Sequence, residues 1–469
     1  MKLKESYLRH TDVIKLFGII IISIALLMFI PGQFEVESMA NISIIQLVFN
    51  ILAVFIFARN GSIFTVSFLI FSWLFHCGQI VKLGFDIEGD VPLPFMNYGT
   101  AESFFKAFLF YYLSQTIITV SAIFSSSLFS FKKSLSFRMQ FDAGKTAKYL
   151  ILIGIIPRLY IDFSRLLGAM TSGYQGVYTL VMPQFIQSIA FFADAGVFFW
   201  IYSLKKNNMH VSYLFWGIVF YKALMVSSGG RQDAVCFLIV WALFYYLKIK
   251  RPSLKSLFII VILSIVGLRF IDIVGNLRSE ELSFGRIIHE FMYGKSNMFG
   301  DMLGEFGSAF CSLVVAVENV PQEVTYGMGR SYLAGIISIV PTLVSRIPFL
   351  NGTTAYTTLI DGTAYFGGSY LGEAYYNFSW CGLLICFLIG WLVGRCQKCL
   401  FEKSISESEF SMIWMAIIGI QLLLFTRGYF TDMIQRTVWL YIVVKLLNRN
   451  SIGAIVMNKM RRNHEENII

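Results

Sequence analysis

The feature that most constrains this chain is a series of apolar runs that recurs from one end of the sequence to the other. Each run is about 20 residues long, the length that an α-helix needs to cross a bilayer. A membrane β-barrel would instead show segments of about ten residues with alternating polarity. Charged residues make up 14% of the 469 residues, against about 25% in a typical soluble domain. The sequence therefore predicts an all-α, polytopic transmembrane helical bundle.

The apolar runs define about twelve spans, and the longest interruption between them divides the chain into three parts. We expect N-terminal membrane helices in residues 1–275, a large external loop in residues 276–378, and C-terminal membrane helices with a tail in residues 379–469. The predicted spans are 13–30, 41–58, 62–81, 104–129, 149–168, 184–204, 211–227, 233–247, 256–275, 379–400, 411–426 and 432–447.

The large loop carries two apolar stretches of its own, Phe310–Val317 and Leu333–Val340. Both are too short to cross a bilayer, so we expect them to be re-entrant, interfacial or buried against the bundle. Long loops in compact folds usually serve a function. This loop is therefore a candidate part of the functional site.

The net charge of +10 follows the predicted topology. Lys and Arg collect in alternate connections, such as residues 132–148 and 248–255, whereas the connections between them carry acids such as Glu35 and Asp86. This positive-inside bias predicts that both termini are cytoplasmic. The bias accounts for the basic charge, so we expect no nucleic-acid partner.

Metal and nucleotide chemistry have no motif in this sequence. A GxxxxGK[ST] loop is missing, which argues against an ATP-driven pump. Cys396 and Cys399 form a CxxC pair, but no second ligand pair accompanies it among the seven cysteines. We expect neither a metal nor a cofactor.

Charged residues inside the predicted spans point to a site. Arg158, Asp162 and Arg165 share one helical face by their spacing. Further charges lie within other spans and at span ends. They are Lys222, the pair Arg269 and Asp272, the pair Asp432 and Arg436, and the span-end residues Arg231, Asp233, Arg278 and Arg427. Charge is costly in a membrane, and arginine is the preferred phosphate ligand. An outward-facing cavity for an anion would explain the surplus of arginine; the alternative is internal ion pairing, with Asp194 pairing with Arg158 or Lys222.

Two glycine-containing segments and one histidine are further candidates. Ser227–Asp233 presents Arg231 at an external helix end, and glycine allows a ligand to approach the backbone there. Gly367–Phe378 brings Glu373 next to Tyr376 and Asn377, a set that suits a sugar; the alternative is an interfacial aromatic belt with a capping glutamate. His289 in the large loop could act as a general base, or be a bystander.

At these residues the chain resembles the bacterial oligosaccharide repeat-unit polymerases, the O-antigen or capsule (Wzy-type) polymerase family. The likeness covers the topology and four short motifs: Gly229–Arg231, Gly329–Leu333 followed by Ile339–Pro341, Gly372–Phe378, and Thr426–Gly428. Arg165 and Gly176 also fit the Arg-x10-Gly spacing of some members. The chain departs from the family at Thr342 and Ser379, where arginine and glycine are frequent.

The resemblance implies an inner-membrane glycosyltransferase with a glycosyltransferase C-like architecture. Its substrates would be undecaprenyl-pyrophosphate-linked oligosaccharides in the outer leaflet, and a chain-length regulator protein and membrane lipids would be its other partners. The implied pyrophosphate ligands are Arg231, Arg278 and Arg427, with Arg158 and Arg165 as further candidates, and Tyr376 and Asn377 would contact the glycan. Glu373, or failing that Asp233, would orient the acceptor hydroxyl.

Two other functions also fit a chain of this topology. A lipid-linked oligosaccharide flippase has about twelve spans, but should show inverted repeats and polar groups through both membrane halves. An O-antigen ligase has a related architecture, but should carry an essential external histidine. The surroundings of His289 do not resemble that histidine's, and neither flippase feature is visible.

Overall fold

The structure, a computed structural model, describes most of the chain. The described residues are 10–29, 35–58, 62–89, 95–127, 141–178, 183–207, 209–226, 231–250, 273, 285, 288–289, 297–340, 343–347, 350, 356, 359, 367–401 and 409–448. Helices make up the regular structure of this part, and it contains no strand, which confirms the all-α class.

The long helices coincide with the predicted spans wherever those are described. They are α1 (His10–Leu27), α2 (Val36–Phe57), α3 (Ile63–Gly84), α4 (Ala101–Ser127), α5 (Ala143–Tyr178), α6 (Gln184–Lys206), α7 (Ser212–Val226), α8 (Arg231–Phe244), α16 (Leu383–Phe401), α17 (Glu409–Phe425) and α18 (Phe430–Leu447). A π-helical turn, η2 (Tyr245–Ile249), continues α8, and a 3-10 turn, η5 (Ser379–Gly382), precedes α16. Of the predicted span 256–275, only Ile273 is among the described residues.

Seven helical stretches of the described chain are long and apolar enough to cross a membrane. These stretches are Val36–Phe57, Ile63–Gly84, Ala101–Ser126, Phe185–Lys206, Gln232–Ile249, Phe299–Asn319 and Tyr370–Leu400. Helices α7 and α17 are apolar but have only 15 and 17 residues, and α5 and α18 carry the charged residues of the predicted site. The chain is therefore a polytopic membrane protein.

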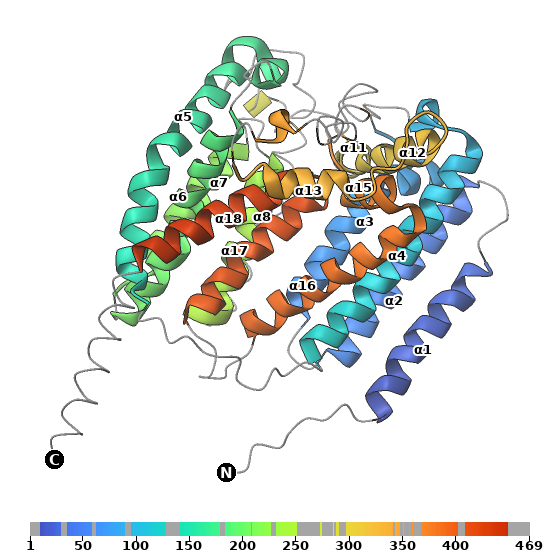
Figure 1. Ribbon diagram of the computed structural model, residues 1–469, viewed down its shortest axis with the longest axis horizontal. Helices are drawn as coiled ribbons and strands as arrows, with labels where there is room; N and C mark the ends of the chain where they lie inside the picture. Colours follow the sequence, from blue (N-terminus) through green and yellow to red (C-terminus); the bar gives the residue numbers. More distant parts are fainter. Residues whose placement is uncertain are drawn as a thin grey trace.

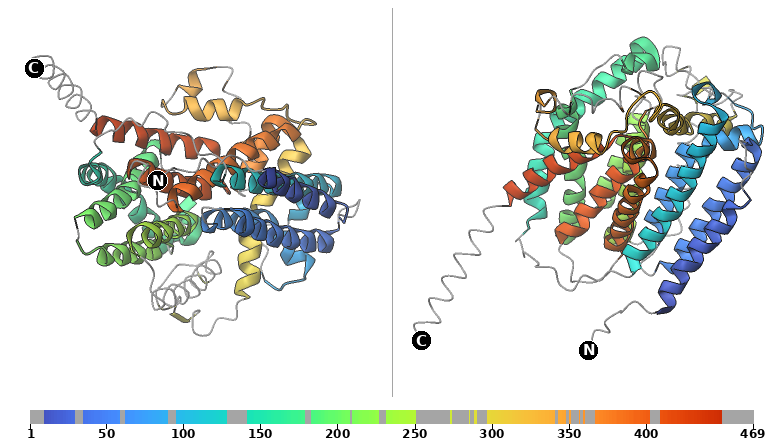
Figure 2. Two further views of the ribbon diagram at one scale, coloured as in Figure 1. Left: turned by 90° about the horizontal axis from the view of Figure 1, so that it is seen from below. Right: turned by 45° about the vertical axis from the view of Figure 1, so that its right-hand side comes forward.

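The described part of the predicted loop forms short helices: α11 (Met298–Phe306), α12 (Ala309–Asn319), α13 (Arg330–Ile337), η3 (Val344–Arg346) and α15 (Tyr370–Phe378), besides η1 (Phe95–Tyr98) from the α3–α4 connection. In Figures 1 and 2, α11 and α12 lie across the end of the bundle, and Phe310–Val317 is buried against it. Together with α11 this stretch becomes Phe299–Asn319, 21 residues that are long and apolar enough to cross a membrane, so the apolar segment is longer than the predicted Phe310–Val317.

The long helices pack as two neighbouring groups. Helices α2, α3 and α4 pack together with α16, whereas α5 packs on α6, and α8 packs on α7 and α17. Glycines allow the closest crossings: a Cβ at Gly154 would lie 2.3 Å from Ala193 N, and one at Gly394 would lie 2.2 Å from Ala122 O. Small residues bring membrane helices together in this way, because lipid offers no hydrophobic drive for their association.

The two ends of the bundle differ. In Figure 1 the start of α1 and the start of α5 lie in the lower part of the view and α18 runs down toward its left, whereas α11 and α12 lie at the upper right and α13 and α15 lie just below them. We call these four short helices the α11–α15 cap. A hydrogen bond from Asn448 Nδ2 to Thr146 Oγ1, at 3.1 Å, joins the end of α18 to the start of α5. The first and last described helices thus approach the chain ends on the side opposite the α11–α15 cap.

Candidate functional site

Helix α5 carries the first charged group of the site. Arg158 Nε lies 2.8 Å from Asp162 Oδ2, one turn further along the helix, and Arg158 Nη1 lies 3.1 Å from Asp194 Oδ2 on α6. Asp162 also accepts a hydrogen bond from the hydroxyl of Tyr221 on α7. These side chains are buried, so the pairing compensates the charges in a setting where they would otherwise be costly.

A second cation shares the carboxylate of Asp194. Lys222 on α7 is 2% exposed, and its Nζ lies 2.5 Å from Asp194 Oδ1 and 4.4 Å from the centre of the Phe237 ring. Asp194 therefore pairs with both Arg158 and Lys222, the two partners that the sequence offered. The internal-pairing alternative is thus confirmed for Arg158 and Lys222.

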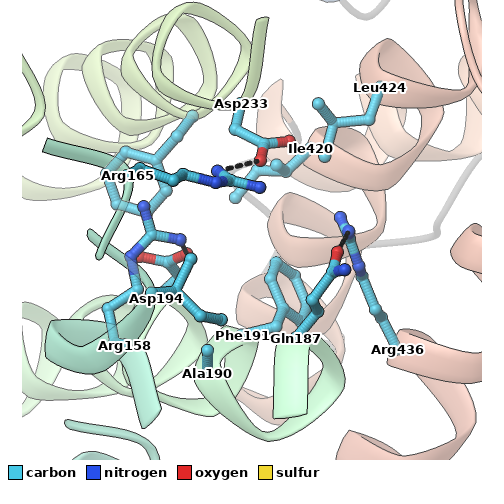
Figure 3. Close-up of a pocket in the computed structure, with 12 residues that line it drawn as sticks. Arg158, Arg165, Gln187, Ala190, Phe191, Asp194, Asp233, Ile420, Leu424 and Arg436 are labelled. Carbon is cyan, nitrogen blue, oxygen red and sulfur yellow. Dashed lines mark hydrogen bonds and ion pairs between the residues drawn. The ribbon is translucent and has the colours of Figure 1, made fainter. Parts of the chain in front are cut away.

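Two further arginines face this cluster across a cavity. Arg165, one helical turn beyond Asp162, holds its Nη1 3.7 Å from Asp233 Oδ2 on α8. Arg436 on α18 donates from Nη2 to Gln187 Oε1 at 3.3 Å. Figure 3 shows the guanidinium groups of Arg158, Arg165 and Arg436 arranged around one space, with Asp233 at its edge. We call this space the arginine lobe.

A second space adjoins the first and is lined by more varied groups. We call it the mixed lobe, because Gln232, Gln421, Arg427, Tyr429 and Asp432 bring amide, guanidinium, aromatic and carboxylate groups to it. Asp233, Leu424 and Arg436 line both lobes. The two lobes are therefore neighbours, between α5, α6, α8, α17 and α18.

The connection from α17 to α18 carries Arg427 and Tyr429 into the mixed lobe, and the cap holds this connection in place. A Cβ at Gly368 would lie 2.7 Å from the backbone of Gly428, so only glycine permits this approach. Gly367 has a φ of +79° and lies beside the Arg427 side chain. The guanidinium carbon of Arg427 lies 5.9 Å from the centre of the Phe75 ring.

Glu373 anchors the same connection from the cap side. Its Oε2 accepts a hydrogen bond from the backbone N–H of Phe430, the first residue of α18, at 2.9 Å. Its Oε1 accepts from Ser331 Oγ at 2.7 Å, and Ser331 Oγ accepts in turn from Asn377 Nδ2 at 2.7 Å. Glu373 is 2% exposed, and it is not among the residues that line either lobe. Its bonds tie α13, α15 and α18 together.

The structure gathers some of the predicted site residues and not others. Arg158, Arg165, Asp233 and Arg427 line the cavity. Glu373, Tyr376 and Asn377 are buried in the cap beside it, and His289 is exposed on a helical segment. Arg231 begins α8 but its side chain is outside the described part, as are Arg278, the pair Arg269 and Asp272, and residues 227–230.

Several polar residues that line the cavity were missing from the predicted ligand set, among them Arg436, Gln187 and Gln421. Arg436 was considered only as an ion-pair partner of Asp432, although its position inside a span was already a signal. Gln187 and Gln421 are uncharged polar residues in spans, so the positions of charged residues gave no signal for them. The described residues contain no group of three metal-ligating side chains.

The comparison with protein families gives one match that covers nearly the whole chain. The family model described as O-antigen polysaccharide polymerase Wzy matches residues 13–448. Searches of curated proteins and of solved structures return no match.

Proposed function

Because the chain belongs to the O-antigen polysaccharide polymerase Wzy family and is therefore an O-antigen repeat-unit polymerase, we propose that its arginine lobe binds the pyrophosphate of the lipid-linked donor. The family assignment also decides against the flippase and the ligase, which no observation favours. The enzyme acts on lipid-linked oligosaccharide repeat units in the membrane.

In the proposed reaction, a hydroxyl oxygen of the acceptor unit attacks the anomeric carbon of the donor glycan. The bond from that carbon to the pyrophosphate oxygen breaks, and the hydroxyl proton passes to a base. The products are the lengthened glycan on the acceptor's lipid and a free polyprenyl pyrophosphate. Negative charge grows on the leaving pyrophosphate, so fixed cations beside it would lower the barrier.

The charges of the cavity support this placement. Arg158, Lys222, Arg165 and Arg436 are four cations, and Asp162, Asp194 and Asp233 are three carboxylates, which leaves one positive charge in and around the arginine lobe. Arginine suits the task because its planar fork offers two N–H groups to neighbouring phosphate oxygens. The observation that carries the proposal is this convergence of three guanidinium groups from α5 and α18 on one cavity.

Asp233 is our proposed partner for the acceptor hydroxyl. It lines both lobes, and its 3.7 Å separation from Arg165 is long for an ion pair, so an entering ligand can replace that contact. Glu373 has a different proposed part, since both of its oxygens already accept hydrogen bonds. We assign it the positioning of the α17–α18 connection and thereby of Arg427. Arg231, Arg278 and His289 stay as sequence-based candidates.

We propose that the chain crosses the membrane about twelve times, as its apolar runs predict, and that it has a glycosyltransferase C-like architecture. We place the protein in the bacterial inner membrane, with both termini in the cytoplasm and the α11–α15 cap in the periplasm. The distribution of Lys and Arg supports this orientation. A chain-length regulator protein is a further proposed partner. Labelling of single cysteines introduced in the cap and near the ends of α1 and α18 tests the orientation.

Arg436→Ala tests the pyrophosphate site in cells that lack their own copy of the polymerase. We expect normal amounts of protein and a glycan profile of single, unpolymerised repeat units. Arg346→Ala is the matched control, because Arg346 is exposed in the cap and does not line the cavity. A full ladder of long chains from the Arg436 variant would contradict the proposal.

A further inference from the structure

The mixed lobe contains a buried hydrogen-bond donor that has no acceptor in the protein. Gln421 on α17 is 1% exposed, and its Nε2 has no hydrogen-bond partner. The same residue lines the mixed lobe. A buried amide donor without a partner destabilises a fold, because the group has lost its water and gained nothing in return. Where such a residue also lines a cavity, as Gln421 does, a ligand can bring the missing acceptor.

The other groups of the mixed lobe indicate the chemistry of that ligand. Gln232, Tyr429 and Asp432 contribute an amide, a phenol ring and a carboxylate. A neutral sugar needs this combination, since its hydroxyls both donate and accept and its ring face packs on aromatic groups. The arginine lobe next to it is lined by three guanidinium groups, which suits an anion, whereas the mixed lobe has the guanidinium groups of Arg427 and Arg436 beside two amides and a phenol.

The residues common to both lobes indicate how the anionic and polyhydroxyl groups of such a ligand are connected. Asp233, Leu424 and Arg436 line both spaces, so a ligand that fills both has its anionic group joined directly to its polyhydroxyl group. A glycosyl pyrophosphate has this structure. The first sugar after the pyrophosphate then reaches the mixed lobe, and the anomeric bond lies between Asp233 and Arg436.

We infer that the mixed lobe is the subsite for the sugar attached to the pyrophosphate, and that Gln421 Nε2 donates a hydrogen bond to an oxygen of that sugar. The inference rests on the proposed pyrophosphate site and adds to it the residue that recognises the donor's reducing-end sugar. Gln421 is then a specificity residue that is stabilised only when substrate is bound.

Binding to the full-length protein in nanodiscs tests this assignment with two probes. One probe is undecaprenyl pyrophosphate without sugar, and the other is the same lipid bearing only the reducing-end sugar of the repeat unit. Gln421→Leu should weaken binding of the sugar-bearing probe about 2- to 12-fold, the usual range for one hydrogen bond to a neutral group. It should leave binding of the sugar-free probe unchanged.

Two further variants serve as checks. Gln421→Met keeps the side-chain length and should give the same contrast between the probes. Gln46→Leu on α2 is the matched control: Gln46 is equally buried, but its Nε2 donates to Tyr112 O at 2.6 Å, far along the chain from the cavity residues. This control should lower thermal stability without changing either affinity, whereas Gln421→Leu should keep or raise thermal stability.

The outcomes distinguish the proposed sugar subsite from the proposed pyrophosphate site. Equal weakening of both probes by Gln421→Leu, or no weakening of the sugar-bearing probe, would overturn the sugar subsite. Arg436→Ala should weaken both probes. If it weakens neither, the pyrophosphate site itself is wrong, whatever Gln421 does.

Discussion

Arg158 pairs with buried carboxylates and is also a proposed ligand of the pyrophosphate. Mutations can distinguish its effect on stability from its effect on polymerisation. The side chains of Arg158 and its partners Asp162 and Asp194 are only 11%, 5% and 12% exposed. Arg158→Ala removes the cation and leaves Asp162 buried, with the Tyr221 hydroxyl as its hydrogen-bond donor among the described residues. Asp194 keeps Lys222 as a partner. The damage should therefore fall mainly on the contact between Arg158 and Asp162.

Breaking a buried ion pair from one side costs about 3–5 kcal/mol, because the other charge stays buried without compensation. Arg158→Ala should therefore lower both the thermal stability and the amount of folded protein, and its loss of polymerisation would be ambiguous. The double variant Arg158→Met with Asp162→Leu removes one positive and one negative charge together. Replacing a buried pair by apolar side chains is often neutral for stability, so the double variant should recover most of the lost stability.

The assay compares the double variant with the single variant and the unmodified protein. Thermal unfolding of purified full-length protein gives the stability, and the glycan ladder of complemented cells gives the activity. We expect near-normal stability with polymerisation reduced about 10²- to 10³-fold, the usual loss for one placed donor at a developing charge. A double variant that is stable and makes long chains would show that Arg158 only links α5 to α6.

Three further substitutions have clear expectations. Arg165→Ala should abolish long glycans. It should change the free energy of unfolding by only about 0–1 kcal/mol, because the ion pair between Arg165 and Asp233 is long and partly exposed. Reduced protein levels in immunoblots would instead indicate that Arg165 stabilises the fold. Asp233→Asn keeps the shape but removes the base, so the polymerisation rate of purified protein should fall about 10²- to 10⁴-fold, and an unchanged rate would exclude Asp233. Glu373→Gln keeps an acceptor for Phe430 N–H and should retain most of the activity, whereas Glu373→Leu should lose it. An inactive Gln variant with normal stability would favour Glu373 as the base.

Local spacing was sufficient for some parts of the site. The separation of four residues between Arg158 and Asp162 predicted a shared face, and the structure pairs them. Asp194 has the two partners that the sequence offered, since few buried cations were available to it. By contrast, the sequence made Glu373 the first candidate for the base, because carboxylate, amide and aromatic residues adjoin it. Its two hydrogen bonds to Ser331 and Phe430 come from segments that no local pattern connects to it.

The sequence by itself determined that the chain is helical and crosses the membrane many times, and which residues are charged where charge is costly. These properties follow from run length and helical periodicity, which each segment carries alone. Only the tertiary structure decided that Arg165, Asp233 and Arg436 line one cavity and that Gln421 leaves a donor without a partner there. The reason is that a helix fixes the direction of its own side chains, but the groups opposite them depend on how α5, α8, α17 and α18 pack together.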